Sequence, residues 1–219
     1  MKLVLFDLDH TLLSGDSDVL WCEFLVEQGV LDGTFTVRNA DIEARYKDGT
    51  VGLEEFADFY VGTLAGRSPQ DWEALRQVFL ATAIVPRVGH AAMALVRKHL
   101  DAGDLVVMTT ATNRFITELT AVYFGIEHLI ATEPGLHNGL FTGHTVGALN
   151  MRGGKLQRLH AWLEASGYKL TDMDSMAYSD SINDLPLLQA VNQAIAVDPD
   201  ARLREEAVAR GWSILLLAR

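Results

Sequence analysis

The segment Leu3-Val4-Leu5-Phe6-Asp7-Leu8-Asp9-His10-Thr11 begins with an apolar run and changes abruptly to acidic and polar residues. A short continuous apolar run of this kind is typical of a strand that is buried on both faces of a parallel sheet. Open parallel sheets place their binding crevice at the carboxyl ends of such strands. The segment therefore predicts a buried first strand that ends at a functional site.

Further apolar runs of strand length follow along the chain and alternate with helical patterns. The strand-like runs span residues 105–108, 176–178, 194–197 and 213–217, and the helical patterns span about 89–102, 113–124, 154–167 and 200–210. This alternation predicts right-handed crossovers, and hence an α/β fold with a doubly wound, Rossmann-like parallel sheet as its core. The Asn138-Gly139 pair predicts a hairpin over residues 137–143 on this core.

Residues 15–85 interrupt the alternation, because consecutive helical patterns replace the strands there. Within this segment, Ser68 is predicted to cap a helix and Pro69 to occupy its first turn. We therefore predict a core domain formed by residues 1–14 and 86–219, and an all-helical domain of residues 15–85 inserted after the first strand.

Two pairs of carboxylates follow two of the predicted strands. Asp7 and Asp9 end the first strand, and Asp180 and Asp184 follow the strand predicted over 176–178. Like charges so close together are unfavourable unless a proton or a cation lies between them. Four carboxylates at a shared sheet edge form an oxygen-rich site that suits Mg²⁺. The sequence therefore predicts a magnesium site at this edge.

Two further segments have the chemistry of a phosphate site. Thr110 ends the strand predicted over 105–108, just before a helix whose free N–H groups would bind an anion. Thr109 is the alternative to Thr110 for this role. Lys155 opens another helix after Gly153-Gly154, and its ammonium is a point charge for phosphate oxygens.

In this order, Asp7-Leu8-Asp9-His10-Thr11, Thr110, Lys155 and Asp180-Ser181-Ile182-Asn183-Asp184 resemble the four ordered motifs of the haloacid dehalogenase (HAD) superfamily. The helical insertion after the first motif resembles the C1-type cap of that superfamily. The chain is most similar to subfamily IB, which contains the phosphoserine phosphatases. The resemblance implies a HAD-like core, a helical cap and a phosphatase.

The resemblance also implies the roles of the acidic residues. Asp7 resembles the nucleophile that forms an aspartyl-phosphate, and Asp9 resembles the general acid and base. Mg²⁺ would be held by the carboxylates of Asp7 and Asp180 and the backbone carbonyl of Asp9. Asp184 would be an outer-shell acid that orients Lys155 or a metal-bound water.

The remaining motif positions are implied to bind the phosphoryl group. Thr110, Lys155 and backbone N–H groups near Ala111 would bind its oxygens. Asn183 would contact the phosphate or the attacking water. An acid two residues after the nucleophile, as in Asp9, is typical of the phosphatases of this family.

One position in the sequence narrows the choice of substrate. The resemblance places Asp16 where phosphoserine phosphatases have a Glu that binds the substrate amine. No counterpart of their carboxylate-binding cap Arg is found, and this favours an amine-bearing phosphate such as histidinol phosphate over phosphoserine. Asp16 is equally well placed to be the N-cap of the first cap helix.

Composition sets limits on the partners. The 219 residues carry 18 Lys and Arg against 29 Asp and Glu, a net charge of −11, which argues against broad binding to nucleic acid. No apolar run approaches the roughly 18 residues needed to span a bilayer. The single cysteine, Cys22, fits a reducing compartment. We expect a cytoplasmic enzyme acting on a small phosphorylated metabolite, with its oligomeric state left open.

Three alternatives to a phosphatase remain. A phosphotransferase would use the same nucleophile but an acceptor alcohol in place of water. A receiver-like signalling domain also gathers Asp, Lys and Mg²⁺ on a doubly wound sheet, but it has its phospho-acceptor on a middle strand and needs no cap. A binding protein could keep the site without turnover.

Overall fold

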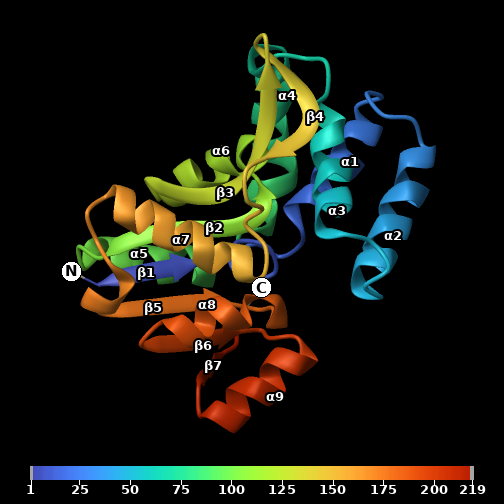
Figure 1. Cartoon of the computed structure of the whole chain (residues 1–219). Coiled ribbons are helices and arrows are strands. Elements are labelled where there is room, and N and C mark those ends of the chain that lie inside the picture. Colours follow the sequence, from blue (N-terminus) through green and yellow to red (C-terminus); the bar gives the residue numbers. More distant parts are fainter. Residues whose placement is uncertain (1, 218–219) are drawn as a thin grey trace.

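The protein is built around a seven-stranded sheet with the strand order β4-β3-β2-β1-β5-β6-β7 (Figure 1). The computed structural model describes residues 2–217, so residues 1, 218 and 219 of the predicted core lie outside the described residues. Neighbouring strands pair in parallel, except that β3 and β4 are antiparallel. The predicted α/β fold is confirmed, with a mixed, mostly parallel sheet.

The strands are β1 (Leu3–Phe6), β2 (Leu105–Asn113), β3 (His128–His137), β4 (Leu140–Val146), β5 (Ser175–Ser179), β6 (Gln193–Val197) and β7 (Ser213–Leu215). The α-helices are α1 (Ser17–Glu27), α2 (Thr34–Lys47), α3 (Leu53–Val61), α4 (Pro69–Phe79), α5 (His90–Asp101), α6 (Arg114–Phe124), α7 (Gly153–Ala165), α8 (Leu185–Ala190) and α9 (Ala201–Arg210). Short helical turns are η1 (Gly62–Leu64), η2 (Leu80–Ile84), η3 (Val85–Arg87), η4 (Leu170–Asp172) and η5 (Ile182–Asp184).

Strand β1 lies in the middle of the sheet and is buried along its whole length. Leu3 and Leu5 pack in the apolar layer that contains residues of α7, α8 and α9. Val4 and Phe6 point to the other layer, which contains residues of α5 and α6. Because successive side chains of a strand point to opposite faces and both faces are covered here, all four residues must be apolar.

Strand β2 extends beyond its predicted range of 105–108 and continues to Asn113, with a register shift between Thr110 and Asn113. The threonines after Met108 remain extended because their hydroxyl groups find partners inside the protein. Asn113 then caps α6, since its Oδ1 accepts a hydrogen bond from the Ile116 amide. The Thr110 hydroxyl group, which donates to Asp9, joins the end of β2 to the residues that follow β1.

The predicted hairpin is confirmed as the connection between β3 and β4. Asn138 and Gly139 both have positive φ angles, 51° and 79°, which are those of the tight turn favoured by Asn-Gly in two-residue hairpins. The hairpin rises above the rest of the sheet beside α3, with which β4 is in contact (Figure 1).

Helices α1 to α4 lie between β1 and α5 in the chain, and we propose that they form the predicted cap of residues 15–85. Ser68 caps α4 as predicted, in a reciprocal capping box with Asp71, and Pro69 opens the helix. The cap rests on the hairpin, because Asp58 of α3 accepts hydrogen bonds from the amide and the hydroxyl group of Thr145 at 2.7 and 2.9 Å.

Among the described residues, no single helix is long and apolar enough to cross a membrane. One strongly bent pair, Pro69–Arg87 with His90–Asp101, meets the length and composition criteria when its two parts are taken together.

Candidate active site

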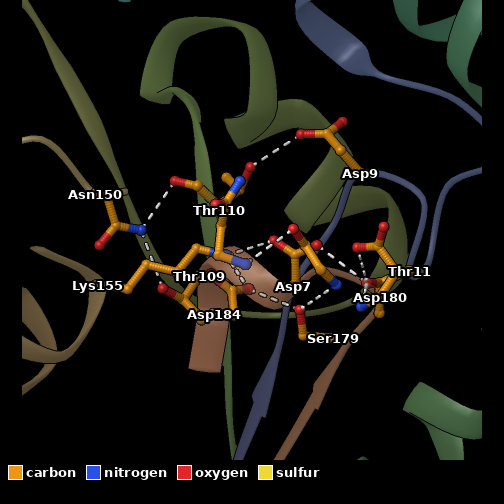
Figure 2. A network of polar contacts seen from close by, with 12 residues as sticks. Asp7, Asp9, Thr11, Thr109, Thr110, Asn150, Lys155, Ser179, Asp180 and Asp184 are labelled. Carbon is orange, nitrogen blue, oxygen red and sulfur yellow. Dashed lines mark hydrogen bonds and ion pairs between the residues drawn. The ribbon is translucent and has the colours of Figure 1, made fainter. Parts of the chain in front are cut away.

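Asp7 stands at the carboxyl end of β1 and is only 7% exposed. Its Oδ1 accepts a 2.6 Å hydrogen bond from the ammonium of Lys155, and its Oδ2 accepts one of 3.0 Å from the Thr11 hydroxyl group (Figure 2). The Asp7 amide donates to the carbonyl of Tyr178 on the neighbouring β5. The carboxylate is therefore held from both sides on a rigid part of the sheet.

Lys155 joins Asp7 to a second buried carboxylate. Its Nζ lies 2.6 Å from Oδ2 of Asp184, which also accepts a 2.8 Å hydrogen bond from the Ser179 hydroxyl group. Lys155 lies in the first turn of α7, Ser179 ends β5 and Asp184 ends η5. The residues predicted from separate motifs thus meet at one edge of the sheet (Figure 2).

The turn before Lys155 depends on a glycine. A Cβ atom on Gly154 would lie 2.1 Å from the carbonyl oxygen of Leu149, whereas one on Gly153 would meet nothing within 4 Å. Gly154 therefore allows a close approach of two backbone segments. The close approach sets the start of α7 and with it the direction of the Lys155 side chain.

Asp180 is tied to Asp7 through Thr11. The Thr11 hydroxyl group lies 3.1 Å from Oδ1 of Asp180 and accepts a 3.0 Å hydrogen bond from the Asp180 amide. A hydroxyl group has one proton to donate, so Thr11 can satisfy only one of the two carboxylates at a time. Asp7 and Asp180 are thus brought together with less positive charge than they need.

The pKa values of these residues reflect the same shortage of positive charge. Burial raises the pKa of Asp7 to about 7; Lys155 opposes this rise, while Asp184 and Asp9 add to it. Burial, reinforced by Asp7, raises the pKa of Asp180 to about 8. Burial alone would lower the pKa of Lys155, but the Asp184 and Asp7 carboxylates raise it above its ordinary value. One lysine does not neutralise this group of acids.

These residues fit a divalent cation. Within residues 2–217, no three His, Cys, Asp or Glu side chains form a complete metal cage. Mg²⁺ does not require one, because it is usually bound through one or two carboxylates and keeps water and substrate phosphate as its other ligands. The carboxylates of Asp7 and Asp180, bridged by Thr11, match that pattern.

Asp9 turns away from Asp7 and toward the cap and β2 (Figure 2). Its Oδ1 accepts a 2.7 Å hydrogen bond from the Ser17 amide at the start of α1. Its Oδ2 accepts from the hydroxyl groups of Thr112 at 3.0 Å and Thr110 at 3.2 Å. The Asp9 side chain therefore links the end of β2 to the first cap helix.

The two candidate threonines point in different directions. The Thr110 hydroxyl group donates to Asp9, whereas that of Thr109 accepts a 3.0 Å hydrogen bond from the amide nitrogen of Asn150. Asn150 is fully buried and also donates to the carbonyl groups of Thr110 and Ile130. Asn150 therefore fixes the backbone at the end of β2 from the side away from Asp9.

A cavity of about 680 Å³ connects these acids to the cap. Ala111 and Asn183 line it, although the Asn183 side chain donates to the Tyr46 hydroxyl group of α2 at 3.3 Å and has no hydrogen bond with Asp7 among the described residues. Asp16 also lines the cavity and is the N-cap of α1, because its Oδ1 accepts from the amides of Asp18 and Val19.

Sequence reasoning missed Thr11, Ser179, Thr112 and Asn150 as parts of this network. Thr11 lies inside a recognised motif and Ser179 lies next to one, so these positions in the sequence could have identified both residues. Thr112 is the second residue after Thr110 and lies between the strand predicted over 105–108 and the helix predicted from residue 113. Asn150 gave no signal, because its three acceptors come from β2 and β3, which are distant in sequence.

Parallel strands that deliver buried carboxylates to one edge of the sheet place the chain among α/β proteins with a functional site at the carboxyl ends of their strands. A family profile described as haloacid dehalogenase-like hydrolase matches residues 4–189. The chain therefore belongs to the haloacid dehalogenase-like hydrolase family, and the predicted HAD-type enzyme is confirmed at this level.

Two relatives illustrate the activities found near this chain. It is 36% identical over 218 residues to the histidinol-phosphatase of Neisseria meningitidis serogroup C (strain 8013), with 98% of each protein covered. It is 32% identical over 217 residues to a phosphoserine phosphatase of Mycobacterium tuberculosis (strain ATCC 25618 / H37Rv), with 95% of this chain and 68% of that protein covered.

Solved structures agree on the fold. A protein of unknown function from Bordetella pertussis Tohama I superposes with a TM-score of 0.94 at 44% identity, with 97% of each chain covered. A substrate-bound phosphoserine phosphatase superposes with a TM-score of 0.68 at 18% identity, with 100% of this chain and 93% of that chain covered. At this low identity the second likeness shows the fold alone.

Proposed function

We propose that the protein is a Mg²⁺-dependent phosphatase that hydrolyses a small phosphomonoester through an aspartyl-phosphate on Asp7. The observation that carries the proposal is the position of Asp7, a buried carboxylate at the end of β1 whose oxygens meet Lys155 on one side and Thr11 on the other. The family match and the phosphatases among the relatives support the same reaction.

In the first step, an Asp7 oxygen attacks phosphorus and the bond from phosphorus to the substrate oxygen breaks. Asp9 gives its proton to the departing oxygen, so that an alcohol leaves. Positioned proton transfer of this kind contributes about 10²–10⁴-fold to the rate. Hydrogen bonds from Ser17, Thr110 and Thr112 hold the Asp9 carboxyl group and would orient it for this transfer.

In the second step, a water molecule attacks the phosphorus of the aspartyl-phosphate. Asp9 takes the proton from that water, the acyl-phosphate bond breaks, and Asp7 and free phosphate are released. Splitting hydrolysis into two displacements is the advantage of covalent catalysis. A phosphotransferase would differ only in the acceptor, with an alcohol in place of water.

Asp7, Asp180 and the backbone carbonyl of Asp9 are the groups that would hold Mg²⁺. The ion would supply positive charge that keeps Asp7 ionised and balances the phosphoryl oxygens. Asp184 would not contact the ion directly. It would orient Lys155, with which it forms a 2.6 Å ion pair.

Lys155, Thr110, Asn183 and the backbone near Ala111 would bind the phosphoryl oxygens. The orientation of Thr110 toward Asp9 favours it over Thr109, whose hydroxyl group is engaged by Asn150. Asn183 would exchange its hydrogen bond with Tyr46 for the phosphate or the attacking water.

We further propose that the substrate bears an amine near its phosphate and that Asp16 binds that amine. Asp16 lines the cavity, and only its Oδ1 is used in capping α1, which leaves Oδ2 for a ligand. Histidinol phosphate and phosphoserine both carry such an amine, and the names of the relatives point to the same two compounds.

Phosphate release from a panel of phosphorylated metabolites tests the proposal, measured with Mg²⁺ and with EDTA. The panel includes histidinol phosphate, phosphoserine and p-nitrophenyl phosphate. We expect Mg²⁺-dependent release with a preference for an amine-bearing phosphate. Indifference to EDTA would refute the metal role, and transfer of phosphate to an added alcohol without free phosphate would identify a phosphotransferase.

A further inference from the structure

The part of the cavity beneath the cap contains two neighbouring carboxyl groups, Asp16 and Asp18, where one substrate amine needs only one. Asp16, Asp18 and Glu43 all line it on the cap side. No Lys or Arg side chain in the described part of the chain forms an ion pair with Asp16 or Asp18. The cations that line the cavity are Lys155, held by Asp7 and Asp184, and Arg152, stacked on Tyr46.

Asp18 lacks adequate partners. Its Oδ2 lies 3.2 Å from the Thr112 hydroxyl group, whose one proton also has Asp9 within 3.0 Å. Its buried Oδ1 has no hydrogen-bond partner among the described residues. A carboxylate supported by a single neutral hydroxyl group is poorly stabilised in its charged form. Burial, reinforced by Asp16 and Asp9, accordingly raises the pKa of Asp18 well above its ordinary value.

A second buried polar group, on α3, is also without a hydrogen-bond partner among the described residues. Tyr60 is 1% exposed, and its hydroxyl group has no hydrogen-bond partner among the described residues. Burial raises the pKa of Tyr60, and the negative charges of Asp18, Asp16 and Glu43 raise it further. Asp18 Oδ1 and the Tyr60 hydroxyl group are thus two buried polar atoms that the described residues leave without a hydrogen bond.

An aromatic wall completes this part of the cavity. The rings of Tyr46 and Phe56, which both line it, stack with their centroids 4.1 Å apart. The Arg152 guanidinium lies 5.3 Å from the Tyr46 centroid, so this wall already accommodates a planar cation. Carboxylates and aromatic faces together favour a flat, positively charged nitrogen group.

We propose that Asp18 and the Tyr46–Phe56 wall form a second subsite, which selects substrates whose remaining arm is a protonatable nitrogen heterocycle and rejects those whose arm is a carboxylate. This inference rests on the proposed function, in which Asp7 takes the phosphate and Asp16 takes the amine. Asp18 is then the residue that determines specificity at the third arm of the substrate.

Three phosphates separate this subsite from the others. Phosphoethanolamine, phosphoserine and histidinol phosphate share a phosphate and an amine on adjacent carbons. They differ in the third arm, which is hydrogen, a carboxylate or a methylene-imidazole. The D enantiomer of phosphoserine is used, because only this enantiomer presents its arm on the same side as L-histidinol phosphate when the phosphate and the amine are overlaid. Differences in kcat/KM among the three therefore report on the third-arm subsite and not on the phosphate or amine sites.

The test is kcat/KM for the three phosphates with the wild type, Asp18→Asn and the control Glu27→Gln. Glu27 is exposed at the end of the same helix and does not line the cavity, so the control makes the same charge change elsewhere. We expect histidinol phosphate to exceed phosphoethanolamine and phosphoserine to be poorest. We expect Asp18→Asn to reduce the ratio of histidinol phosphate to phosphoserine at least tenfold, and Glu27→Gln to leave it within twofold.

The results that would overturn the subsite differ from those that would overturn the proposed function. An unchanged ratio in Asp18→Asn, or an equal loss on all three phosphates, overturns the subsite while leaving the phosphatase intact. Phosphate release from none of them, nor from p-nitrophenyl phosphate, by the folded wild type contradicts the proposed function itself. If Asp18→Asn does not fold, Phe56→Leu serves instead, and a histidinol phosphate to phosphoethanolamine ratio that does not fall overturns the proposal.

Discussion

Lys155 and Asp7, which lie 148 positions apart in the chain, form a buried ion pair of 2.6 Å. The pair joins the first turn of α7 to the end of β1. The same ammonium reaches Asp184, so that one cation serves two buried carboxylates. Removing either charge leaves the others without compensation, which makes this group the part of the protein most sensitive to substitution.

Lys155→Met tests this dependence. At pH 8 the variant leaves Asp7 and Asp184 buried without a cation, and we expect a loss of about 3–5 kcal/mol in the free energy of unfolding. At pH 5 the loss is smaller, because Asp7, whose pKa is raised to about 7, then carries a proton. Thermal unfolding at both pH values measures the difference, with the exposed Lys169→Met as control. Equal losses at the two pH values contradict the account.

Gly154→Ala and Gly153→Ala form a matched pair. The new Cβ at 154 would overlap the Leu149 carbonyl oxygen at 2.1 Å, whereas the one at 153 meets nothing within 4 Å. We expect Gly154→Ala to move Lys155, lower the melting temperature and reduce kcat by at least about tenfold, a barrier change of about 1.4 kcal/mol. Gly153→Ala is expected to retain the melting temperature and the kcat of the wild type. Similar behaviour of the two variants would show that the close approach is unimportant.

Stability without metal is expected to fall as the pH rises. Asp7, Asp16 and Asp180 would titrate near 3.8 when unfolded but near 7, 7 and 8 when folded. The folded form binds protons more tightly, so the free energy of unfolding decreases between about pH 4 and pH 8. Calorimetry in EDTA measures this trend, and a melting temperature that rises over this range would contradict it.

Mg²⁺ should reverse that trend. A ligand at 100 times its Kd stabilises the folded form by about 2.7 kcal/mol, or about 5–10 °C for a chain of this size. The gain is expected to be larger at pH 8 than at pH 5, because the ion competes with protons for Asp7 and Asp180. Repeating the calorimetry with Mg²⁺ checks this, and NaCl at the same ionic strength controls for screening. A gain that is equal at both pH values argues against these ligands.

Two roles are assigned to Asp16, binding of the substrate amine and capping of α1, and substitutions separate them. Asp16→Asn keeps an N-cap for α1 but removes the charge, whereas Asp16→Ala loses the cap as well and costs about 1 kcal/mol more. If Asp16 binds the amine, both variants lose activity on phosphoethanolamine more than on p-nitrophenyl phosphate. If capping is its only role, Asp16→Asn behaves as the wild type on both substrates, and kcat/KM for each distinguishes the two results.

Much of the fold follows from local patterns. The apolar run Leu3–Phe6, the Asn138-Gly139 turn and the Ser68-Pro69 helix start each determine their element through contacts close in sequence. The acids at the strand ends and Lys155 were also recognisable, because parallel strands bring their carboxyl ends to one edge.

What the sequence does not determine are the contacts made between distant segments. The extension of β2 to Asn113 depends on partners for its threonines, and the orientation of Asp9 toward Thr112 and Ser17 depends on how α1 meets β2. The hydrogen bonds of Asn150 to β2 and β3 and of Asp58 to the hairpin arise only once the sheet is assembled.

The aspartyl-phosphate on Asp7 is tested most directly by stopping turnover with acid and mapping phosphorylated residues by tandem mass spectrometry. Histidinol phosphate and p-nitrophenyl phosphate serve as substrates, with Mg²⁺ or EDTA, and Asp7→Asn is the control. The account predicts a phosphoryl group on Asp7 in the presence of Mg²⁺, none in EDTA, and none in Asp7→Asn, whose turnover falls by at least about 10³-fold. Phosphorylation at another residue, or Mg²⁺-dependent turnover that persists in Asp7→Asn, would contradict it.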